Sequence, residues 1–279
     1  MAVGDPRGIG PEVVRKALRQ PLDADVRIVG GLEDGAKMPN DLEAGRAAAQ
    51  NIEAAARLAL SGEVDAIVTG PVNKLALHAA GYRFPGVTEF LAHIAGDVPV
   101  AMMLTTGRLR VVLVTTHLSL RDAIASVTTE RVVQAGRIAT DALRQWWGIT
   151  TPRLALCALN PHAGESGLFG DEDERLLRPA ATALDAAGPL PADTVFVRAL
   201  RGEFDAVLAP YHDVGMTAVK VSGFGTGVNV TLGLPFIRTS PDHGTAFDIA
   251  GKGIADAGSM RASLELAVQL VGARQQRGD

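Results

Sequence analysis

Short apolar runs alternate along the chain with longer segments in which apolar residues recur at three- and four-residue spacing. The short runs predict β-strands, and the longer segments predict amphipathic helices. The predicted strands cover residues 26–29, 65–69, 110–115, 154–159 and 205–209. The predicted helices include 42–60, a segment that ends at 147, and 259–273. Strands separated by helices favour the α/β class with a largely parallel, buried sheet.

Several predicted helices begin at recognisable signals. Thr128 or Thr129 has the chemistry of an N-cap for the helix that ends at residue 147. Pro11 suits the first turn of a helix, where its missing N–H costs nothing. Asp171 and Glu174 have the spacing of a capping box at the head of the helix that follows residue 159.

The composition is that of a folded α/β protein whose core is built from small and branched side chains. Hydrophobic residues make up 47% of the 279 residues and aromatic residues only 4%, so Ala, Val, Leu and Ile must fill the core. The formal charge is −4, and no Lys/Arg run is long enough to follow a phosphate backbone. Nucleic acid is therefore not expected as a partner.

The sequence also bears on the cellular compartment. No apolar stretch approaches the roughly 20 residues that span a bilayer, and residues 1–5 lack the features of a secretory signal. The single cysteine, Cys157, excludes an internal disulfide and a thiolate metal cluster. We therefore expect a cytoplasmic protein that has no membrane partner.

Three of the six histidines follow predicted strands at equivalent positions. His117, His162 and His212 each come within three residues of the carboxyl end of an apolar run. In open α/β sheets, ligands bind at that edge. Three imidazoles that converge there would suit Zn²⁺, Co²⁺ or a similar divalent ion with an open coordination position. The alternative for each histidine is a structural hydrogen bond.

Two glycine-rich segments, residues 4–12 and 223–227, lack the spacing and context of the dinucleotide fingerprint. A nicotinamide cofactor, if bound, is therefore not held in the Rossmann manner. The glycines of residues 4–12 could let a ligand approach the amides at the start of the following helix. They could equally form a tight turn.

The densest group of polar residues lies between residues 212 and 248, interleaved with glycine. Two cations and an amide in this stretch could bind a phosphate or a carboxylate, namely Lys220, Asn229 and Arg238. The carboxylates of the same stretch are Asp213, Asp242 and Asp248. A solvated loop could carry the same residues, but their density favours a binding site.

At these positions the sequence resembles the 4-hydroxythreonine-4-phosphate dehydrogenase family. Matching motifs are Gly-Asp-Pro-x-Gly-Ile-Gly-Pro-Glu at 4–12, Val-Thr-Gly-Pro-Val-Asn-Lys at 68–74, Thr-Thr-His at 115–117, Leu-Asn-Pro-His-Ala-Gly-Glu at 159–165 and Tyr-His-Asp at 211–213. The longest is Gly-Val-Asn-Val-Thr-Leu-Gly-Leu-Pro-Phe-Ile-Arg-Thr-Ser-x-Asp-His-Gly-Thr-Ala at 227–246. Together the motifs cover nearly the whole chain in order.

The resemblance implies an isocitrate-dehydrogenase-like two-domain α/β fold with a largely parallel sheet and the active-site cleft between the domains. The first domain would comprise residues 1–80 and 245–279, and the second would comprise residues 81–244. The second domain would carry the metal site and the interface of a homodimer. The implied cofactors are NAD or NADP and a divalent metal ion (Zn, Mg or Co).

The resemblance also assigns roles to individual residues. The implied metal ligands are His117, His162 and His212. The implied substrate-binding residues are Thr88, Lys220, Asn229 and Arg238. The implied NAD(P)-binding residues are Asn229, Leu232, Gly233, Asp242, His243 and Asp248. Either Asp213 or Lys220 could take the proton of the substrate hydroxyl.

The sequence departs from the family pattern in a few places. Val87 precedes Thr88 where the family has a histidine, and Val214 stands where the family has a glutamine. The segment between Gly30 and Gly45 is shorter than in the family, and little precedes the first motif. The two valines touch the implied site and therefore bear on the choice of substrate.

The implied reaction is the oxidation of 4-phosphohydroxy-L-threonine to 2-amino-3-oxo-4-phosphobutanoate, followed by decarboxylation to 3-amino-2-oxopropyl phosphate. This is a step of pyridoxal 5'-phosphate biosynthesis. Alternatives within the family are a phosphorylated sugar acid of the 4-phosphoerythronate or threonate type and a cis-dihydrodiol carboxylate. More distant alternatives are a metal hydrolase with a three-histidine site and a metabolite-binding regulatory module.

Overall fold

The computed structural model describes residues 1–33 and 40–276, which form two compact units. The first unit comprises residues 1–100 and 225–279, and the second comprises residues 101–224. The sequence predicted a discontinuous first domain with boundaries near 80 and 245. Residues 81–100 and 225–244 belong instead to the first unit, because they contribute a helix and two strands to it.

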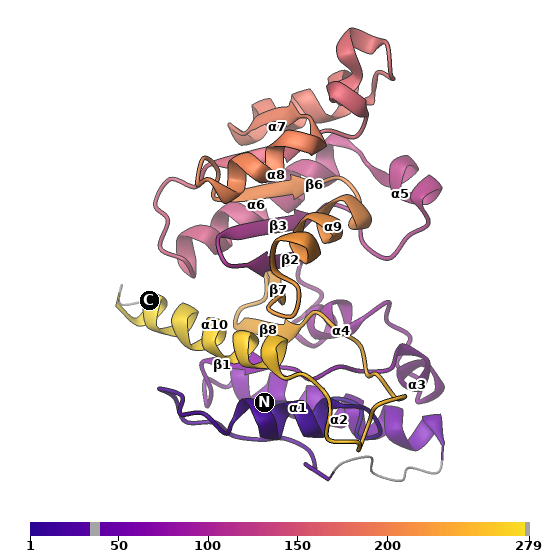
Figure 1. Cartoon of the computed structure of the whole chain (residues 1–279), viewed down its shortest axis with the longest axis vertical. Helices are drawn as coiled ribbons and strands as arrows, with labels where there is room; N and C mark the ends of the chain where they lie inside the picture. Colours follow the sequence, from indigo (N-terminus) through magenta and orange to yellow (C-terminus); the bar gives the residue numbers. More distant parts are fainter. Residues whose placement is uncertain (34–39, 277–279) are drawn as a thin grey trace. The chain divides into compact units, whose positions relative to one another are not determined.

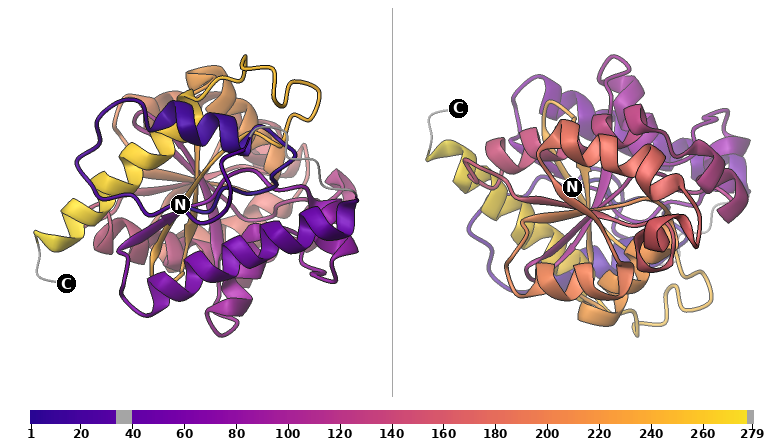
Figure 2. Two further views of the ribbon diagram at one scale, coloured as in Figure 1. Left: turned by 90° about the horizontal axis from the view of Figure 1, so that it is seen from below. Right: turned by 90° about the horizontal axis from the view of Figure 1, so that it is seen from above.

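The strands of the first unit lie between helical layers. Strand β8 (Ile237–Pro241) is parallel to β1 (Ala66–Val68) on one side and antiparallel to β7 (Val228–Leu232) on the other. The helices are α1 (Gly10–Ala17), α2 (Asp41–Leu60), α3 (Lys74–Ala79), α4 (Val87–Ile94) and α10 (Gly258–Gln275). Helices α1 and α10 lie on one side of these strands, and α2 lies on the other (Figures 1 and 2).

Two neighbouring residues of β1 show how these layers are built. Ile67 belongs to the apolar cluster that contains Ile52 of α2, whereas Val68 belongs to the cluster that contains Val13 of α1 and Leu264 of α10. Successive side chains of a strand point to opposite faces, so one apolar strand serves both layers. The face on which Ile67 lies also receives α4, which carries Thr88.

The second unit contains the strands β2 (Ala101–Thr106), β3 (Leu109–Leu113), β6 (Ala206–Ala209), β4 (Leu154–Cys157) and β5 (Ala187–Leu190), in this spatial order. All neighbouring pairs among them are parallel except β2 and β3. Its helical segments are α5 (Leu120–Ser126), α6 (Thr129–Gln145), η1 (Pro161–Gly167), η2 (Asp173–Leu177), α7 (Arg178–Leu184), α8 (Ala192–Leu200) and α9 (His212–Gly223). The predicted α/β class with a largely parallel sheet is confirmed.

The core of the second unit is built from small and branched side chains, as the composition required. Residues of α8 and α9 pack on one face of the strands, as Val195 and Val219 do on Val207 and its neighbours. Cys157 lies in the same cluster, where burial raises the pKa of its thiol to about 12. It is an inert core side chain.

Several helix ends follow the sequence signals. The hydroxyl of Thr128 accepts the N–H of Arg131, which confirms Thr128 as the N-cap of α6. The side chain of Asn40 caps α2 by accepting the N–H of Glu43. No helix within residues 1–33 and 40–276 is both long and apolar enough to cross a membrane.

The predicted capping box at Asp171 is wrong. The helical segment begins after Glu172 and has no side-chain cap. The buried carboxylate of Asp173 instead turns back to accept the N–H groups of Leu159 and Asn160, at 2.7 and 2.9 Å. The acidic residue therefore anchors the loop that leaves β4, and this loop carries His162.

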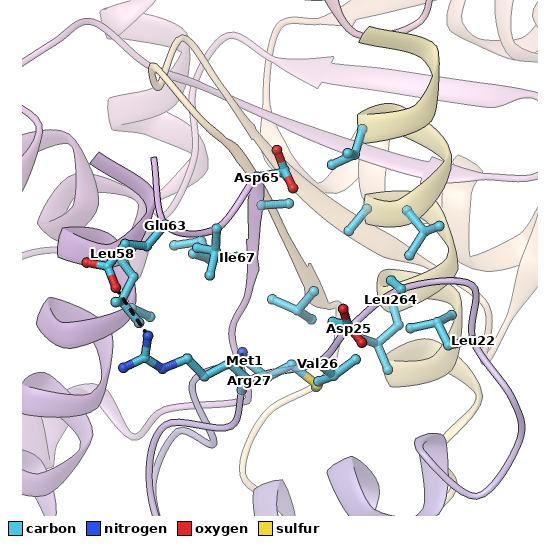
Figure 3. Close-up of a pocket in the computed structure, with 18 of the residues that line it drawn as sticks. Met1, Leu22, Asp25, Val26, Arg27, Leu58, Glu63, Asp65, Ile67 and Leu264 are labelled. Carbon is cyan, nitrogen blue, oxygen red and sulfur yellow. Dashed lines mark hydrogen bonds and ion pairs between the residues drawn. The ribbon is translucent and has the colours of Figure 1, made fainter. Parts of the chain in front are cut away.

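The predicted strand at residues 26–29 forms only at its last residue. Val29 makes a single parallel bridge with Ala2, which also bridges Thr69. Before Val29 the chain lines a cavity of about 540 Å³, together with Leu58, Ile67 and Leu264 (Figure 3). A strand needs a neighbouring strand to pair with along its length, and here the pairing covers only one residue. None of the predicted site residues lines this cavity.

Candidate active site

The three predicted metal-binding histidines follow strands that are neighbours in the sheet. Strand β6 is parallel to β3 on one side and to β4 on the other. The segments that follow these three strands therefore leave the sheet at the same edge. The Thr115 hydroxyl donates to the carbonyl of Pro210 at 2.8 Å and joins the segments that follow β3 and β6. The rings of His117 and His212 lie 5.6 Å apart, centroid to centroid.

His212 is held in a particular orientation by its neighbour. It is the first residue of α9, and its Nδ1 lies 2.7 Å from Oδ1 of Asp213. A carboxylate can only accept, so a neutral His212 carries its proton on Nδ1 and leaves the lone pair on Nε2. Metal-binding histidines are commonly oriented in this way by a carboxylate.

His162 does not join this pair within one chain. It is exposed, lies in the η1 segment with a φ of 52°, and its ring is 6.2 Å from that of Phe169. Among the described residues, no group of three His, Cys, Asp or Glu side chains could hold a metal ion. The structure thus brings together two of the three predicted ligands.

A second group of predicted residues lies in the first unit, around a buried guanidinium. Arg238 of β8 is only 3% exposed. Its Nε and Nη2 donate to the Thr69 hydroxyl at 3.2 and 2.6 Å, and its Nη1 donates to the Thr231 hydroxyl at 2.9 Å. The Thr231 hydroxyl lies 3.3 Å from that of Thr88 at the start of α4. The three threonines and Arg238 form a polar cluster inside the apolar face of the unit.

The charge of this cluster is not neutralised by direct contact. Within the described part of the chain, no ion pair is formed by Arg238, whose guanidinium contacts are hydroxyls. Burial lowers the pKa of Arg238 to about 10, and the charge of Glu89 acts in the opposite direction. The group is therefore still cationic at neutral pH. A buried cation held by neutral hydroxyls is suited to an incoming anion.

Asn229 lies near this cluster on β7, two residues before Thr231 and hence on the same strand face. Its buried Oδ1 has no hydrogen-bond partner among the described residues. Buried amides are normally satisfied, so an unpaired one indicates a missing partner such as a ligand. Lys220 belongs to the second unit, on α9, with its Nζ 5.6 Å from the centre of the Phe224 ring.

The predicted cofactor residues also lie in the first unit. Leu232 is buried at the end of β7, and Gly233 follows with a φ of 90°. Asp242 packs against Gly227, where a Cβ would lie 2.2 Å from the carboxylate. The Nε2 of His243 is buried without a hydrogen-bond partner in the described part of the chain, while its Nδ1 lies 3.0 Å from the carbonyl of Gly244. Asp248 is exposed in the same loop.

The first glycine-rich segment contacts the loop that carries Asp242 and His243. Ile9 donates its N–H to the carbonyl of Thr245 at 2.9 Å, and a Cβ at Gly8 would lie 2.7 Å from the same oxygen. The buried carboxylate of Asp5 pairs with Arg7 at 3.0 Å. Gly8 is therefore explained by close packing of two loops rather than by the approach of a ligand.

The two valines that depart from the family pattern both pack on apolar side chains. Val87 lies against the cluster that contains Phe90, and Val214 lies against the core of the second unit. Thr69 and Thr231 were not among the predicted site residues, although both fall within matched motifs. The alternation of side chains along a strand could have indicated Thr231, because this residue lies on the same strand face as Asn229.

Comparisons with known proteins show the family to which the chain belongs. The family profile described as pyridoxal phosphate biosynthetic protein PdxA matches residues 21–267. The chain is 44% identical to a 4-hydroxythreonine-4-phosphate dehydrogenase of Beijerinckia indica subsp. indica, over 97% of this chain and 94% of the relative. It is 42% identical to the D-threonate 4-phosphate dehydrogenase of Salmonella typhimurium, over 97% of this chain and 98% of the relative.

Solved structures extend the comparison to the fold. The 4-hydroxythreonine-4-phosphate dehydrogenase of Klebsiella pneumoniae superposes with a TM-score of 0.85 at 38% identity, over 96% of this chain and 98% of that one. An isocitrate dehydrogenase of Methylococcus capsulatus shares the fold alone, with a TM-score of 0.51 at 18% identity over 98% of this chain and 85% of that one. The chain belongs to the family of pyridoxal phosphate biosynthetic proteins PdxA.

Proposed function

We propose that the protein is a dehydrogenase that oxidises the secondary alcohol of a phosphorylated hydroxy acid with NAD or NADP. The best-fitting substrate is 4-phosphohydroxy-L-threonine, which would give 2-amino-3-oxo-4-phosphobutanoate and reduced nicotinamide. Loss of CO₂ from this β-keto acid then gives 3-amino-2-oxopropyl phosphate. The observation that carries the proposal is the buried cation Arg238, which is held by hydroxyls and contacts no carboxylate among the residues that the structure describes.

In this proposal the phosphate is bound by Thr88, Lys220, Asn229 and Arg238. The guanidinium supplies charge and donors in a fixed plane, which suits a phosphate. The hydroxyl of Thr88 and the amide of Asn229 add neutral hydrogen bonds. Binding energy from a group remote from the reacting carbon positions that carbon for hydride transfer.

His117 and His212 fit the donor set of a divalent metal ion, which would be Zn, Mg or Co. Asp213 orients His212 so that its Nε2 is available as a ligand. A divalent ion bound there would favour ionisation of the substrate hydroxyl and stabilise the enolate that decarboxylation forms. His162 is the third proposed ligand. Because one chain does not bring it to the pair, we propose that a second copy completes the site.

Two groups could take the hydroxyl proton, Asp213 and Lys220. The Asp213 carboxylate already binds His212 at 2.7 Å, which favours an orienting role for Asp213. Lys220 is half-buried on the same helix and is the other candidate. For the nicotinamide cofactor, we propose the loop from Asn229 to Asp248. The buried His243 Nε2, which has no hydrogen-bond partner in residues 1–33 and 40–276, supports this assignment.

The direct test is a screen of hydroxy acids with NAD and NADP, followed by the absorbance of reduced nicotinamide. The screen contains 4-phosphohydroxy-L-threonine, D-threonate 4-phosphate, 4-phosphoerythronate and a cis-dihydrodiol carboxylate. Turnover of the first at the highest kcat/KM supports the proposal. No nicotinamide reduction with any of them would overturn it and favour a hydrolase or a regulatory module.

A second candidate substrate is D-threonate 4-phosphate, which appears in the name of the Salmonella typhimurium relative that is 42% identical to this chain. It has the same phosphate but carries a hydroxyl where 4-phosphohydroxy-L-threonine carries an amino group. Val87 departs from the family pattern beside Thr88, and this difference is the reason to retain D-threonate 4-phosphate as an alternative substrate.

Replacing Val87 by histidine should lower KM for the phosphorylated substrate. A hydrogen bond to a charged group contributes roughly 1.5–3 kcal/mol, or about one to two decades in affinity. The side chain lies against the Phe90 cluster and is only partly buried, so the larger ring can be accommodated. Steady-state kinetics of wild type, Val87→His and Val87→Leu would measure the effect. An equal KM in all three variants would mean that Val87 only fills space.

We expect the active protein to be a homodimer, because one chain brings together only two of the three proposed ligands. Sedimentation velocity at assay concentration should give a single dimeric species. Mixing inactive His212→Ala subunits with inactive His162→Ala subunits should restore part of the activity if each site takes ligands from both copies. A fully active monomer would contradict this arrangement.

A further inference from the structure

The hydrogen bonds around Arg238 have a fixed direction. A guanidinium can only donate, so the hydroxyl oxygens of Thr69 and Thr231 must act as acceptors. Thr69 accepts from both Nε and Nη2, and Thr231 accepts from Nη1. Both threonines are fully buried, so water does not compete for these bonds.

Each of these hydroxyls still has one hydrogen to donate. The Thr231 hydroxyl faces that of Thr88 at 3.3 Å, and since its oxygen already accepts from Arg238, its hydrogen can be donated to Thr88. This leaves the Thr88 hydrogen for a ligand. In that arrangement the hydrogen bonds run from Arg238 through Thr231 to Thr88.

We infer that Thr69 and Thr231 are positioning residues of the anion subsite. They fix the plane of the Arg238 guanidinium, and Thr231 turns the Thr88 hydroxyl into a donor toward the ligand. The subsite then presents donors to an oxyanion, such as a phosphate monoester, whose oxygens accept. This inference rests on the proposed function only for the identity of the substrate.

The amide of Asn229 agrees with this polarity. Its Oδ1 is buried without a partner in the described residues. Oxygen and nitrogen of an amide have the same shape, so turning the amide over places a donor at this position at no steric cost. Glu89 is the carboxylate that acts on Arg238, but it turns back toward the head of α4, where a Cβ on Gly86 would lie 3.1 Å from its Oε2.

The alternative is that the threonines merely satisfy a structural arginine. The two roles differ in their response to a conservative change. Thr231→Val keeps the shape and removes the hydroxyl, whereas Thr231→Ser keeps the hydroxyl. A matched control is Thr239→Val, which removes a fully buried hydroxyl from the neighbouring residue of β8, where it bonds to the carbonyl of Ser263.

The experiment measures the dissociation constant of inorganic phosphate by calorimetry, and KM and kcat for the phosphorylated substrate. For Thr231→Val we expect phosphate binding to weaken and KM to rise by about ten- to a hundredfold, as for a lost hydrogen bond to a charged group, with kcat little changed. Thr231→Ser should restore binding to near the wild-type value, and Thr239→Val should not alter it. Thr69→Val tests the same claim at the other nitrogens if Thr231→Val does not fold.

Unchanged phosphate binding in Thr231→Val, or an equal loss in Thr239→Val, would overturn the inference. Failure of the proposed function gives a different result. In that case no hydroxy acid reduces the nicotinamide, but phosphate binding still depends on Thr69 and Thr231.

Discussion

Replacing Arg238 by methionine should lower kcat/KM for a phosphorylated hydroxy acid by about two to three decades and leave the protein at least as stable as the wild type. Truncating one partner of a buried hydrogen bond between charged groups weakens binding by roughly 2–5 kcal/mol. Stability should not fall, because burial lowers the pKa of Arg238 to about 10. In the unfolded chain the pKa of Arg238 keeps its higher, ordinary value, so the guanidinium is charged in both states at neutral pH and its burial destabilises the folded state. Methionine removes that cost, which offsets the loss of the hydrogen bonds that Thr69 and Thr231 accept from Arg238.

Kinetics and thermal unfolding of Arg238→Met measure the two effects together. The matched control is Arg110→Met, because burial also lowers the pKa of Arg110 in the second unit. This control should bind phosphate as the wild type does. A wild-type KM in Arg238→Met would show that Arg238 does not form an anion subsite. A loss of activity that is matched by a collapse of the fold would assign Arg238 a structural role instead.

Exchange of either histidine of the His117–His212 pair for alanine should reduce turnover to background and lower the metal content per subunit. Neither side chain is buried in the core, so the fold should survive the change. His93 provides the control, since it is an exposed histidine whose Nδ1 lies 2.8 Å from Asp97 of its own helix end. Metal analysis by mass spectrometry and circular dichroism separate loss of metal from loss of fold.

His162→Ala should have the same effect if this residue supplies the third ligand. Full activity of His162→Ala after exhaustive chelation would eliminate the three-histidine mechanism. Loss of activity with normal metal content would instead point to a role of His162 in the η1 loop, which Asp173 anchors.

Much of the fold could be predicted because its signals are local. The strands β3, β4 and β6 are short apolar runs, and α2 and α6 have clear periodicity with a capping side chain at the start. The strand at 26–29 was overpredicted because an apolar run does not show whether a neighbouring strand exists to pair with it. The capping box at Asp171 failed for a related reason. An acidic side chain at the right spacing can also bind a distant backbone, as Asp173 does.

The site was predicted only in part. The strand-end rule identified His117 and His212, which lie side by side, because parallel strands end at a common edge. It could not show that His162 lies in the η1 segment among residues with positive φ. Arg238 stood out as a charged residue, but Thr69 and Thr231 did not. A buried threonine on a strand looks like an ordinary core residue until its acceptor role is visible.

We propose that a buried cationic subsite selects a phosphorylated hydroxy acid for oxidation. The most direct measurement is the ratio of kcat/KM for 4-phosphohydroxy-L-threonine to that for 4-hydroxy-L-threonine, in the wild type and in Arg238→Met. The account predicts a ratio of about a hundred or more in the wild type, from the roughly 2–5 kcal/mol of a buried charge contact, and a much smaller ratio in the variant. Equal kcat/KM for both forms in the wild type would contradict it and favour a substrate without a phosphate.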